Sequence, residues 1–328
     1  MQRELGHSGI KISAMGAGLW AIGGPWDMSG LAAGWGETDD AESIRAIHAA
    51  IDHGITFFDT AANYGAGHSE QVLARALEGR RDQVVIATKF GFNVAEGQRK
   101  VEPYDGGSTS PLVVRNLRAE CEASLRRLNT DHIDLYQFHF NDYSPEHAGA
   151  VRDELEKLVA EGKIRAYGWS TDFEDGARVF AQGAHCASIQ VNMNVTHDNP
   201  RILAVCDKFN LAAIIRGPLG MGLLTGKYTR ESTFAANDVR SRDWVKDGFA
   251  DPIFDHLDDL RGLLTSGGRT LAQGALAWLW ARSEHTVPIP GVRTVAQVEE
   301  DAGAMSFGPL TPDQMAQIAS ILSRPETA

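Results

Sequence analysis

The stretch Gly-Ile-Thr-Phe-Phe-Asp-Thr-Ala-Ala-Asn-Tyr-Gly, residues 54–65, joins a short apolar run to a polar loop. Its β-branched and aromatic residues predict a buried strand, and Asp59 and Tyr64 follow where that strand ends. A tyrosine hydroxyl has an ordinary pKa near ~10, so it gives up a proton at neutral pH only beside a cation. The stretch therefore predicts acid–base chemistry at a strand end, with the cation supplied from elsewhere in the chain.

Apolar, β-rich runs alternate with amphipathic stretches along the whole chain, which predicts parallel strands joined by crossover helices. The expected strands are residues 14–19, 56–58, 84–88, 133–138, 166–169, 188–191, 212–215 and 286–289. The expected helices include residues 41–53, 69–77, 111–128, 145–161, 201–209 and 271–282. Residues 228–268 predict a long loop and an extra helix after the seventh strand.

Eight such strands predict an α/β fold of the (β/α)8 TIM barrel class, formed by residues 1–328 as a single domain. A β-hairpin near residues 5–12 would precede the barrel, and extra helices would follow it. An open, doubly wound sheet is the alternative.

The composition excludes several classes of protein. A net charge of -12 disfavours a nucleic-acid partner, and three scattered cysteines suit neither a disulfide framework nor a zinc site. No other metal site is expected. The amino-terminal residues lack an apolar signal region, and no long apolar run predicts a membrane span. A cytoplasmic protein is expected.

Polar residues end several of the expected strands, where the active sites of (β/α)8 barrels lie. Lys89 would lower the pKa of Tyr64, Asp59 would hold Lys89, and His139 would orient a carbonyl oxygen or relay a proton. Each residue also has a purely structural interpretation: a turn carboxylate, a half-buried phenol, a strand-end lysine and a core histidine. Their coincidence at successive strand ends favours a proton-donating site.

The chain resembles the aldo-keto reductases in motifs that run in order over nearly its whole length. They are residues 54–65, 67–70, 87–91, 133–139, 162–168, 222–227 and 288–291. The resemblance implies a (β/α)8 barrel that binds a nicotinamide dinucleotide without a Rossmann domain. It also implies a catalytic tetrad of Asp59, Tyr64, Lys89 and His139, in which hydride passes to a carbonyl carbon while Tyr64 protonates the oxygen.

One motif points elsewhere. Residues 16–21, Gly-Ala-Gly-Leu-Trp-Ala, match the GxGxxA spacing of a dinucleotide-binding turn. However, Gly23, Gly24 and Pro25 interrupt the helix that should follow, so no helix N-terminus would face a pyrophosphate. The Rossmann interpretation is therefore disfavoured.

The resemblance also implies a cofactor site. Ser170 and Gln190 would hold the nicotinamide carboxamide, Arg216 would stack on the ring, and the loop at 217–227 would cover the pyrophosphate. Arg293 would meet an adenosine 2'-phosphate and favours NADPH. Asp301 replaces a common asparagine near the adenine, and its charge would repel that phosphate, so NADH is the alternative. The implied set is Ser170, Gln190, Arg216, Gly217, Pro218, Leu219, Gly222, Leu224, Lys227, Gly291, Arg293, Gln297 and Asp301.

Aromatic residues near the strand ends would form the substrate site, and the loops at 24–37 and 91–108 would set its specificity. The candidates, which could equally be core residues, are Trp20, Trp26, Trp35, Phe90, Phe92, Phe140 and Trp169, of which Trp20, Trp26, Phe90 and Phe140 are the preferred set. We expect a small aldehyde or ketone, such as a sugar or an aromatic carbonyl compound, to be reduced to the alcohol. The alternatives are a sugar dehydrogenase working in the oxidative direction and a cofactor-binding regulatory module with little turnover. The sequence specifies neither the substrate nor the oligomeric state.

Overall fold

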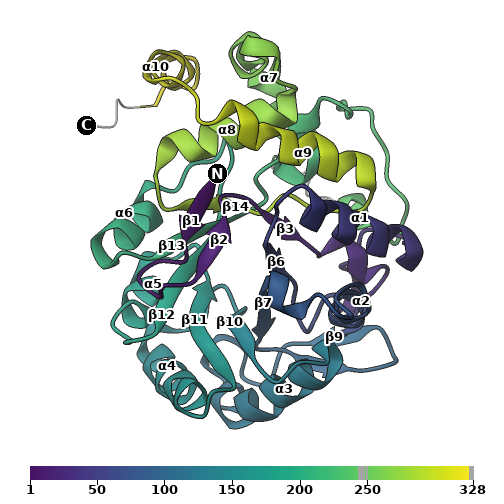
Figure 1. Cartoon of the computed structure of the whole chain (residues 1–328), viewed down its shortest axis with the longest axis vertical. Helices are drawn as coiled ribbons and strands as arrows, with labels where there is room; N and C mark the ends of the chain where they lie inside the picture. Colours follow the sequence, from purple (N-terminus) through teal and green to yellow (C-terminus); the bar gives the residue numbers. More distant parts are fainter. Residues whose placement is uncertain (243–247, 249, 325–328) are drawn as a thin grey trace.

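Eight parallel strands form the centre of this computed structural model, which describes residues 1–242, 248 and 250–324 (Figure 1). They neighbour one another in chain order, so the sheet is singly wound and the expected barrel is confirmed. The strands are β3 (Gly16–Gly18), β6 (Phe57–Asp59), β7 (Val85–Phe90), β10 (Ile133–Phe138), β11 (Ile164–Ser170), β12 (Cys186–Asn192), β13 (Ala212–Arg216) and β14 (Thr286–Pro288).

The barrel closes where β3 meets the segment that follows β14. Gly18 forms a parallel bridge with Gly291, and its N–H donates to the carbonyl of Pro290 at 2.8 Å. A side-chain Cβ on Gly18 would lie 2.7 Å from the carbonyl oxygen of Ile289, so this close approach requires glycine. The glycines of the GxGxxA pattern therefore belong to a barrel seam and not to a nucleotide-binding turn.

An antiparallel hairpin plugs the amino-terminal end of the barrel. Its strands are β1 (Gln2–Glu4) and β2 (Lys11–Ser13), so the predicted range 5–12 covered the turn and only part of the second strand. Leu5, Ile10 and Ile12 are buried together with the inward-facing apolar side chains of the strands. The hairpin thus completes the inner core.

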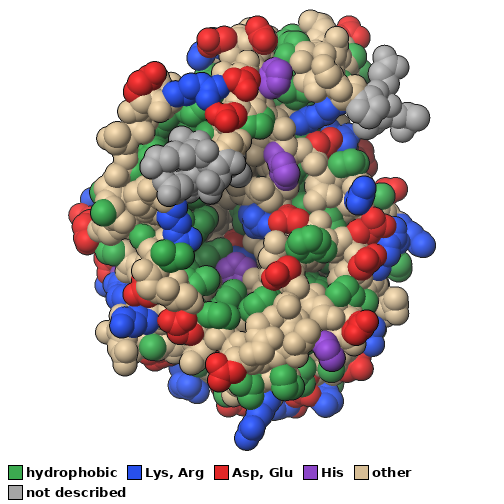
Figure 2. Space-filling model, turned by 180° about the vertical axis from the view of Figure 1, so that it is seen from behind, with side chains coloured by type: hydrophobic (Ala, Val, Ile, Leu, Met, Phe, Trp, Pro, Cys, Tyr) green, Lys and Arg blue, Asp and Glu red, His purple; other side chains and the backbone are tan. Residues whose placement is uncertain are grey.

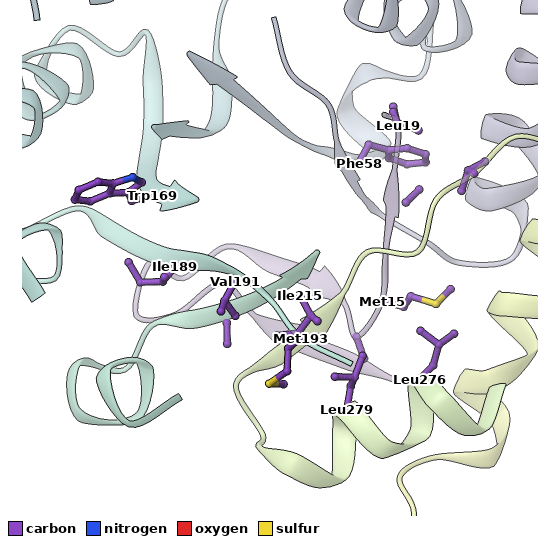
Figure 3. Close-up of a cluster of buried hydrophobic side chains, with 14 of the residues drawn as sticks. Met15, Leu19, Phe58, Trp169, Ile189, Val191, Met193, Ile215, Leu276 and Leu279 are labelled. Atoms are coloured by element: carbon purple, nitrogen blue, oxygen red, sulfur yellow. The ribbon is translucent and has the colours of Figure 1, made fainter. Parts of the chain in front are cut away.

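Helices surround the barrel and bury the outward-facing side chains of the strands. They are α1 (Asp40–Asp52), α2 (His68–Ala76), α3 (Leu112–Leu128), α4 (Pro145–Ala160), α5 (Glu174–Phe180), α6 (Pro200–Phe209), α7 (Asp251–Leu264), α8 (Leu271–Arg282), α9 (Val295–Phe307) and α10 (Pro312–Ile321). Figure 3 shows part of this outer core, where Leu276 and Leu279 of α8 lie near Met15 and Ile215. The predicted extra helix after the seventh strand is α7; residues 243–247 and 249 of that segment lie outside the described residues.

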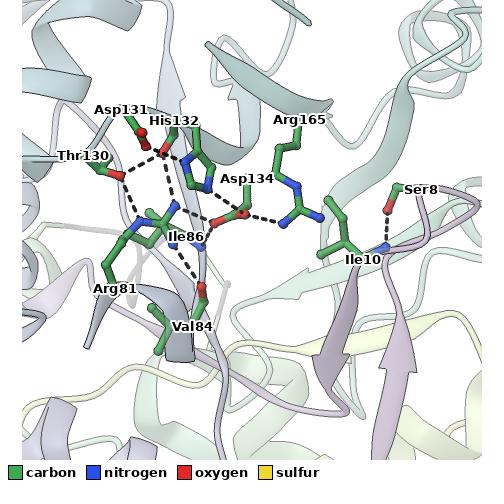
Figure 4. Close-up of polar contacts among 10 residues, drawn as sticks. All are labelled: Ser8, Ile10, Arg81, Val84, Ile86, Thr130, Asp131, His132, Asp134 and Arg165. Carbon is green, nitrogen blue, oxygen red and sulfur yellow. Dashed lines mark hydrogen bonds and ion pairs between the residues drawn. The ribbon is translucent and has the colours of Figure 1, made fainter. Parts of the chain in front are cut away.

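A carboxylate fixes the amino-terminal ends of three neighbouring strands (Figure 4). Asp134 of β10 accepts hydrogen bonds from Arg81 at 2.8 Å, from the N–H of Ile86 at 2.9 Å and from Arg165 at 2.7 Å. Its side chain is 2% exposed, and two arginines compensate its buried charge. This cluster lies at the end of the barrel opposite the expected active site.

At the carboxyl end, two loops from distant parts of the chain pair into a small sheet. Strands β4 (Asp27–Met28) and β5 (Leu31–Ala32) come from the loop after β3, and β8 (Asn93–Ala95) and β9 (Lys100–Glu102) from the loop after β7. β4 pairs with β9 in parallel. Figure 2 shows this face of the molecule hollowed near its centre, with hydrophobic side chains around the hollow. We call the hollow the mouth of the barrel, and the small sheet of β5, β4, β9 and β8 the mouth sheet.

Several negative findings concern only the residues that the structure describes. Within them, no helix combines the length and apolarity that a membrane crossing requires. No group of three or more His, Cys, Asp or Glu side chains there is arranged to hold a metal ion. The three cysteines are free and buried.

The hairpin plug leads to a stability prediction. Leu5 is fully buried, so Leu5→Ala should leave a cavity and lower the free energy of unfolding by about 2–5 kcal/mol. Lys11→Ala, an exposed change in the same hairpin, should shift it by no more than about 0.5 kcal/mol. Urea unfolding of both variants measures the difference. Equal stabilities would show that the hairpin does not contribute to the core.

Candidate active site

One buried carboxylate joins four strands at the carboxyl end of the barrel. Asp59, the last residue of β6, is 1% exposed. Its Oδ1 accepts a hydrogen bond from Lys89 of β7 at 2.5 Å. Its Oδ2 accepts from Gln137 of β10 and from Gln190 of β12, both at 2.9 Å. Asp59 therefore fixes a lysine and two amides around one point.

Lys89 uses all three of its N–H donors inside this site. Besides Asp59, its Nζ donates to the carbonyl oxygen of Thr60 at 2.8 Å and to the Tyr64 hydroxyl at 3.2 Å. The ammonium lies 4.7 Å from the centre of the Tyr64 ring. The expected cation is thus Lys89, and its position relative to Tyr64 is set by Asp59.

The pKa of Tyr64 differs from the expected direction. Burial raises it above the usual value, and although the nearby Lys89 charge acts to lower it, the net shift is upward. Burial likewise acts to lower the pKa of Lys89, but Asp59 and Tyr64 outweigh it and the net shift is upward. Lys89 therefore acts on the Tyr64 pKa in the expected direction, but burial outweighs it and the phenol pKa is not lowered overall. At neutral pH the site holds a protonated phenol beside an ammonium, which is the form that donates a proton.

His139 follows β10 and faces Tyr64, with their ring centres 5.7 Å apart and nearly perpendicular. Its Nδ1 lies 3.1 Å from the side-chain oxygen of Asn63. Burial, followed by the charges of Lys89 and Arg216, holds the pKa of His139 well below its usual value. The imidazole is therefore neutral at physiological pH. A neutral ring can orient a substrate by hydrogen bonding without competing with Tyr64 as the acid.

Two predicted cofactor residues lie beside the tetrad. Ser170 ends β11 and is 2% exposed, and its hydroxyl is 3.4 Å from the side-chain oxygen of Gln190. Gln190 donates to Asp59 and also to Gln137 at 3.2 Å. The amide of Gln190 therefore already supports Asp59, which leaves the Ser170 hydroxyl as the freer group for a carboxamide.

The loop after β13 contains several glycines in the left-handed backbone conformation. Arg216 ends the strand and pairs with Asp172. Gly217, Gly220 and Gly222 all have positive φ, and a Cβ at Gly217 would lie 2.7 Å from the side-chain oxygen of Asn192. Other predicted members of this loop, Pro218 and Leu224, are buried, whereas Leu219 is half-buried and Lys227 is exposed. The N–H groups of Gly220, Gly222, Leu224 and Gly226 donate to carbonyl oxygens within the loop, so the exposed lysine is the group that most clearly suits an anionic ligand.

The segment before α9 hydrogen-bonds to the loop that follows β5. Arg293 donates to the carbonyl oxygens of Trp35 at 3.1 Å and Glu37 at 2.7 Å. Gln297 accepts from the N–H of Arg293 at 3.0 Å and completes a capping box at the start of α9. Gly291 lies in the barrel seam described above. Only part of the Arg293 guanidinium is thus engaged, and its remaining N–H groups can meet a ligand.

The loops after β5 and β13 also contact each other. The N–H of Val239 donates to the carbonyl of Gly34 at 2.7 Å, and the Arg240 guanidinium lies 4.8 Å from the Trp35 ring centre. Trp35 in turn packs edge-on against Trp20 at 5.3 Å. The long loop after β13 is thus connected, through Trp35, to Trp20 at the carboxyl end of the barrel.

The predicted substrate residues separate into two groups. Trp20 stacks against Tyr64 at 6.1 Å, and Trp26 is buried with Tyr64 under the mouth sheet. Phe140 is half-buried and stacks on Phe92 at 5.5 Å. Phe90, by contrast, is 1% exposed and packs in the outer core, because side chains alternate along β7 and Lys89 takes the inward direction. We withdraw Phe90 from the substrate site, together with Trp169, which is also fully buried in the outer core, and retain Phe92.

Asp301 is buried within α9, at 5% exposed. Burial raises its pKa to about 8, Glu300 adds to the rise, and Lys227 opposes it. At neutral pH this carboxyl group is therefore mostly protonated. The repulsion of a nearby phosphate, which was the reason to consider NADH, requires the charged form and is weakened accordingly.

Comparisons with known proteins identify the family and the fold. The sequence model of the Aldo/keto reductase family matches residues 14–323. The chain belongs to the aldo/keto reductase family. It is 33% identical over 306 residues to the aldo-keto reductase YhdN of Bacillus subtilis, covering 90% of this chain and 86% of that protein. It is 29% identical to the chloroplastic pyridoxal reductase of Arabidopsis thaliana, covering 94% of this chain and 83% of that protein.

Solved structures give the same result for this aldo/keto reductase. A glycerol dehydrogenase from Gluconobacter oxydans superposes with a TM-score of 0.81 at 32% identity, covering 98% of this chain and 95% of that one. An aldo/keto reductase from Klebsiella pneumoniae, solved with NADP and acetate, gives a TM-score of 0.71 at 26% identity, with the same coverage. These relatives support a nicotinamide cofactor.

Two residues of the site were not singled out from the sequence. Gln137 supports Asp59, and Asn63 contacts His139. Strand alternation could have indicated Gln137, because it lies two residues before His139 on the same face of β10. Asn63 lies in a turn, where no periodicity indicates the direction of a side chain.

The raised pKa of Asp301 predicts how stability depends on pH. An unfolded Asp has a pKa near ~3.9, so between about pH 4 and 8 the folded protein holds a proton that the unfolded chain lacks. The free energy of unfolding must therefore fall as pH rises through this window. Asp301→Asn removes the titration, so relative to the unmodified protein it should gain about 2 kcal/mol between about pH 6 and pH 8. Urea unfolding without cofactor tests this, and parallel pH curves would refute it.

Proposed function

We propose that this chain reduces an aldehyde or ketone to the alcohol, with hydride from NADPH and the proton from Tyr64. The observation that carries the proposal is the Lys89 ammonium, which is bound at once to Asp59, Thr60 and the Tyr64 hydroxyl. A phenol held in this way faces the mouth with its proton retained. Trp20 beside this phenol and Phe92 beside His139 provide apolar walls that suit an aromatic or aliphatic carbonyl compound.

The division of work among the residues follows from their contacts. A bound nicotinamide dinucleotide supplies the hydride. The protein supplies the proton: as charge develops on the carbonyl oxygen, Tyr64 Oη releases its proton toward it, and Lys89 stabilises the phenolate left behind. Neutral His139 orients the oxygen. Asp59, with Gln137 and Gln190, keeps Lys89 in place throughout.

The residues present fit such a cofactor. Lys227 on the loop after β13 is exposed, Arg216 offers a planar guanidinium at a strand end, and Ser170 has a hydroxyl close to the tetrad. Arg293 retains free donors for a 2'-phosphate, and Asp301 is mostly uncharged at neutral pH. We therefore propose NADPH in preference to NADH.

Oxidation of an alcohol by the same groups is the second candidate. One solved relative, at 32% identity, is described as a glycerol dehydrogenase. In that direction Tyr64 has to accept a proton and therefore to begin as the phenolate. Because burial raises the pKa of Tyr64, oxidation should be efficient only at alkaline pH. Assays of glycerol and simple sugar alcohols with NADP+ over a pH series distinguish the two directions.

Tyr64→Phe tests the proton donor. The variant should lose about 10²- to 10⁴-fold in the rate of carbonyl-dependent NADPH oxidation, because general acid catalysis typically contributes that much. Its NADPH affinity, followed by fluorescence titration, should be unchanged. Tyr143→Phe is the matched control, since this buried tyrosine donates to the carbonyl of Ser110 and does not contact Lys89. If Tyr64→Phe turned over like the control, the assignment of the acid would be wrong.

Arg293→Ala tests the cofactor preference. Loss of charge-assisted hydrogen bonds to a 2'-phosphate should raise the Kd for NADPH by about 10- to 100-fold. The variant also loses its contacts with Trp35 and Glu37, but that loss acts on both cofactors. The informative quantity is the ratio of the NADPH and NADH affinities. An unchanged ratio would refute a role of Arg293 in reading the phosphate.

A further inference from the structure

The loop between β7 and α3, residues 91–111, forms one side of the mouth. It begins directly after Lys89 and Phe90, and it contributes β8 and β9 to the mouth sheet. At its start, Phe92 packs edge-on against His139 at 5.9 Å and stacks on Phe140 at 5.5 Å. The position of this loop therefore determines a wall of the proposed substrate site.

One carboxyl group on α3 holds the loop at two points, its first residue and Tyr104. Glu120 Oε2 accepts a hydrogen bond from the N–H of Gly91 at 2.9 Å, and Oε1 accepts one from the Tyr104 hydroxyl at 3.0 Å. The backbone of Phe92 also hydrogen-bonds to this carboxyl group. Residues 91 and 104 are thereby tied to a single point. A third tie comes from Arg127 on the same helix, which pairs with Glu96 in the turn between β8 and β9.

The backbone at Gly91 is restricted by its conformation and packing as well as by the hydrogen bond to Glu120. Gly91 has a φ of 121°, which residues with a side chain rarely adopt. A Cβ there would lie 3.0 Å from the ring of Phe138. A shift of Gly91 would therefore displace Phe92, and Phe92 contacts His139. Glu120 does not touch the mouth itself.

We propose that Glu120 is a positioning residue for the substrate site: it ties Gly91 and Tyr104 to α3 and so sets Phe92 against His139 and Phe140. The proposal rests on the reductase function above and extends it to a residue beneath the site. Substitutions at Glu120 should act on the affinity for the carbonyl compound, whereas the hydride and proton steps and the cofactor site should be little affected.

The state of the carboxyl group adds a dependence on pH. Burial raises the pKa of Glu120 to about 7, against the opposing hydrogen bonds of Gly91, Tyr104 and Phe92 and the charge of Arg127. Tyr136 of β10 faces it from the barrel, and Arg127 is itself paired with Glu70. If the loop opened, Glu120 would become solvated and its pKa would return toward ~4.3. The anchored state thus binds the proton more tightly, and raising the pH from about 6 to about 8.5 should loosen the loop.

Hydrogen–deuterium exchange tests the anchor without requiring turnover. In Glu120→Ala, amides of residues 91–104 should exchange at least about 10-fold faster than in the unmodified protein, because the hydrogen bonds to the carboxyl group are lost. Glu120→Gln is the conservative variant: its side-chain oxygen can accept from Gly91 and its NH₂ can donate to Tyr104. Glu122→Ala is the matched control, since Glu122 lies on the same helix but pairs with Lys163. It should exchange like the unmodified protein.

The same variants are then assayed with NADPH and 4-nitrobenzaldehyde. Glu120→Ala should raise KM at least about 10-fold, with kcat and the Kd for NADPH changed less than about 2-fold; Glu120→Gln should restore a low KM. Between about pH 6 and pH 8.5, KM and loop exchange, corrected for intrinsic amide rates, should rise in the unmodified protein and stay constant in Glu120→Gln.

The results that would contradict the Glu120 proposal differ from the result that would contradict the reductase function. Unchanged exchange in Glu120→Ala would overturn the anchor, and faster exchange with an unchanged KM would overturn its role in the substrate site. A Glu120→Gln variant that kept the pH dependence of the unmodified protein would exclude the carboxyl group as its source. Failure of the unmodified protein to oxidise NADPH with any carbonyl compound would instead refute the reductase function, and the exchange result would still decide whether Glu120 anchors the loop.

Discussion

The ion pair between Asp59 and Lys89 is the interaction on which the rest of the site depends. Its side chains are 2% and 0% exposed, so removing either partner would leave an uncompensated buried charge at a cost of about 3–5 kcal/mol. The pair is stable because Gln137, Gln190 and Thr60 satisfy its remaining hydrogen-bonding groups. Asp59 and Lys89 lie on the neighbouring strands β6 and β7, but Gln137 and Gln190 come from β10 and β12, so the full set of contacts requires these strands to face a common centre. The chemistry thus depends directly on the fold.

The two ends of the barrel use buried charge for different purposes. At the amino-terminal end, Asp134 is compensated by two arginines and holds β7, β10 and β11 together. At the carboxyl end, Lys89 donates one of its three hydrogen bonds to Tyr64, the group that changes its protonation state in the proposed reaction. The first arrangement is a structural tie. The second leaves one partner able to release a proton, and loops from distant parts of the chain enclose it.

The barrel and the four tetrad residues could be predicted from the sequence. Alternating apolar runs predicted the barrel, and the polar residues that end them predicted the tetrad, because the strand ends of a parallel barrel meet on one face. Other features depend on contacts that no local pattern encodes. The mouth sheet has strands of two or three residues, too short for periodicity. The pKa of Tyr64 depends on burial by the mouth, and the tie from Glu120 to Gly91 spans 29 positions of the chain. Phe90 lies in the outer core because side chains alternate along β7 and its neighbour Lys89 points inward.

Single-turnover reduction in H₂O and D₂O is the most direct test of Tyr64 as a protonated acid supported by Lys89. The protein is preloaded with saturating NADPH and mixed with a saturating concentration of a carbonyl compound at each pH, so that the pH dependence of KM does not enter the rate. With the pKa of Tyr64 raised and that of His139 well lowered, the rate should be slower in D₂O and should stay constant from about pH 6 to about pH 9. Equal rates in the two solvents, or a rate that fell as the pH rose through about 7, would contradict proton donation by Tyr64.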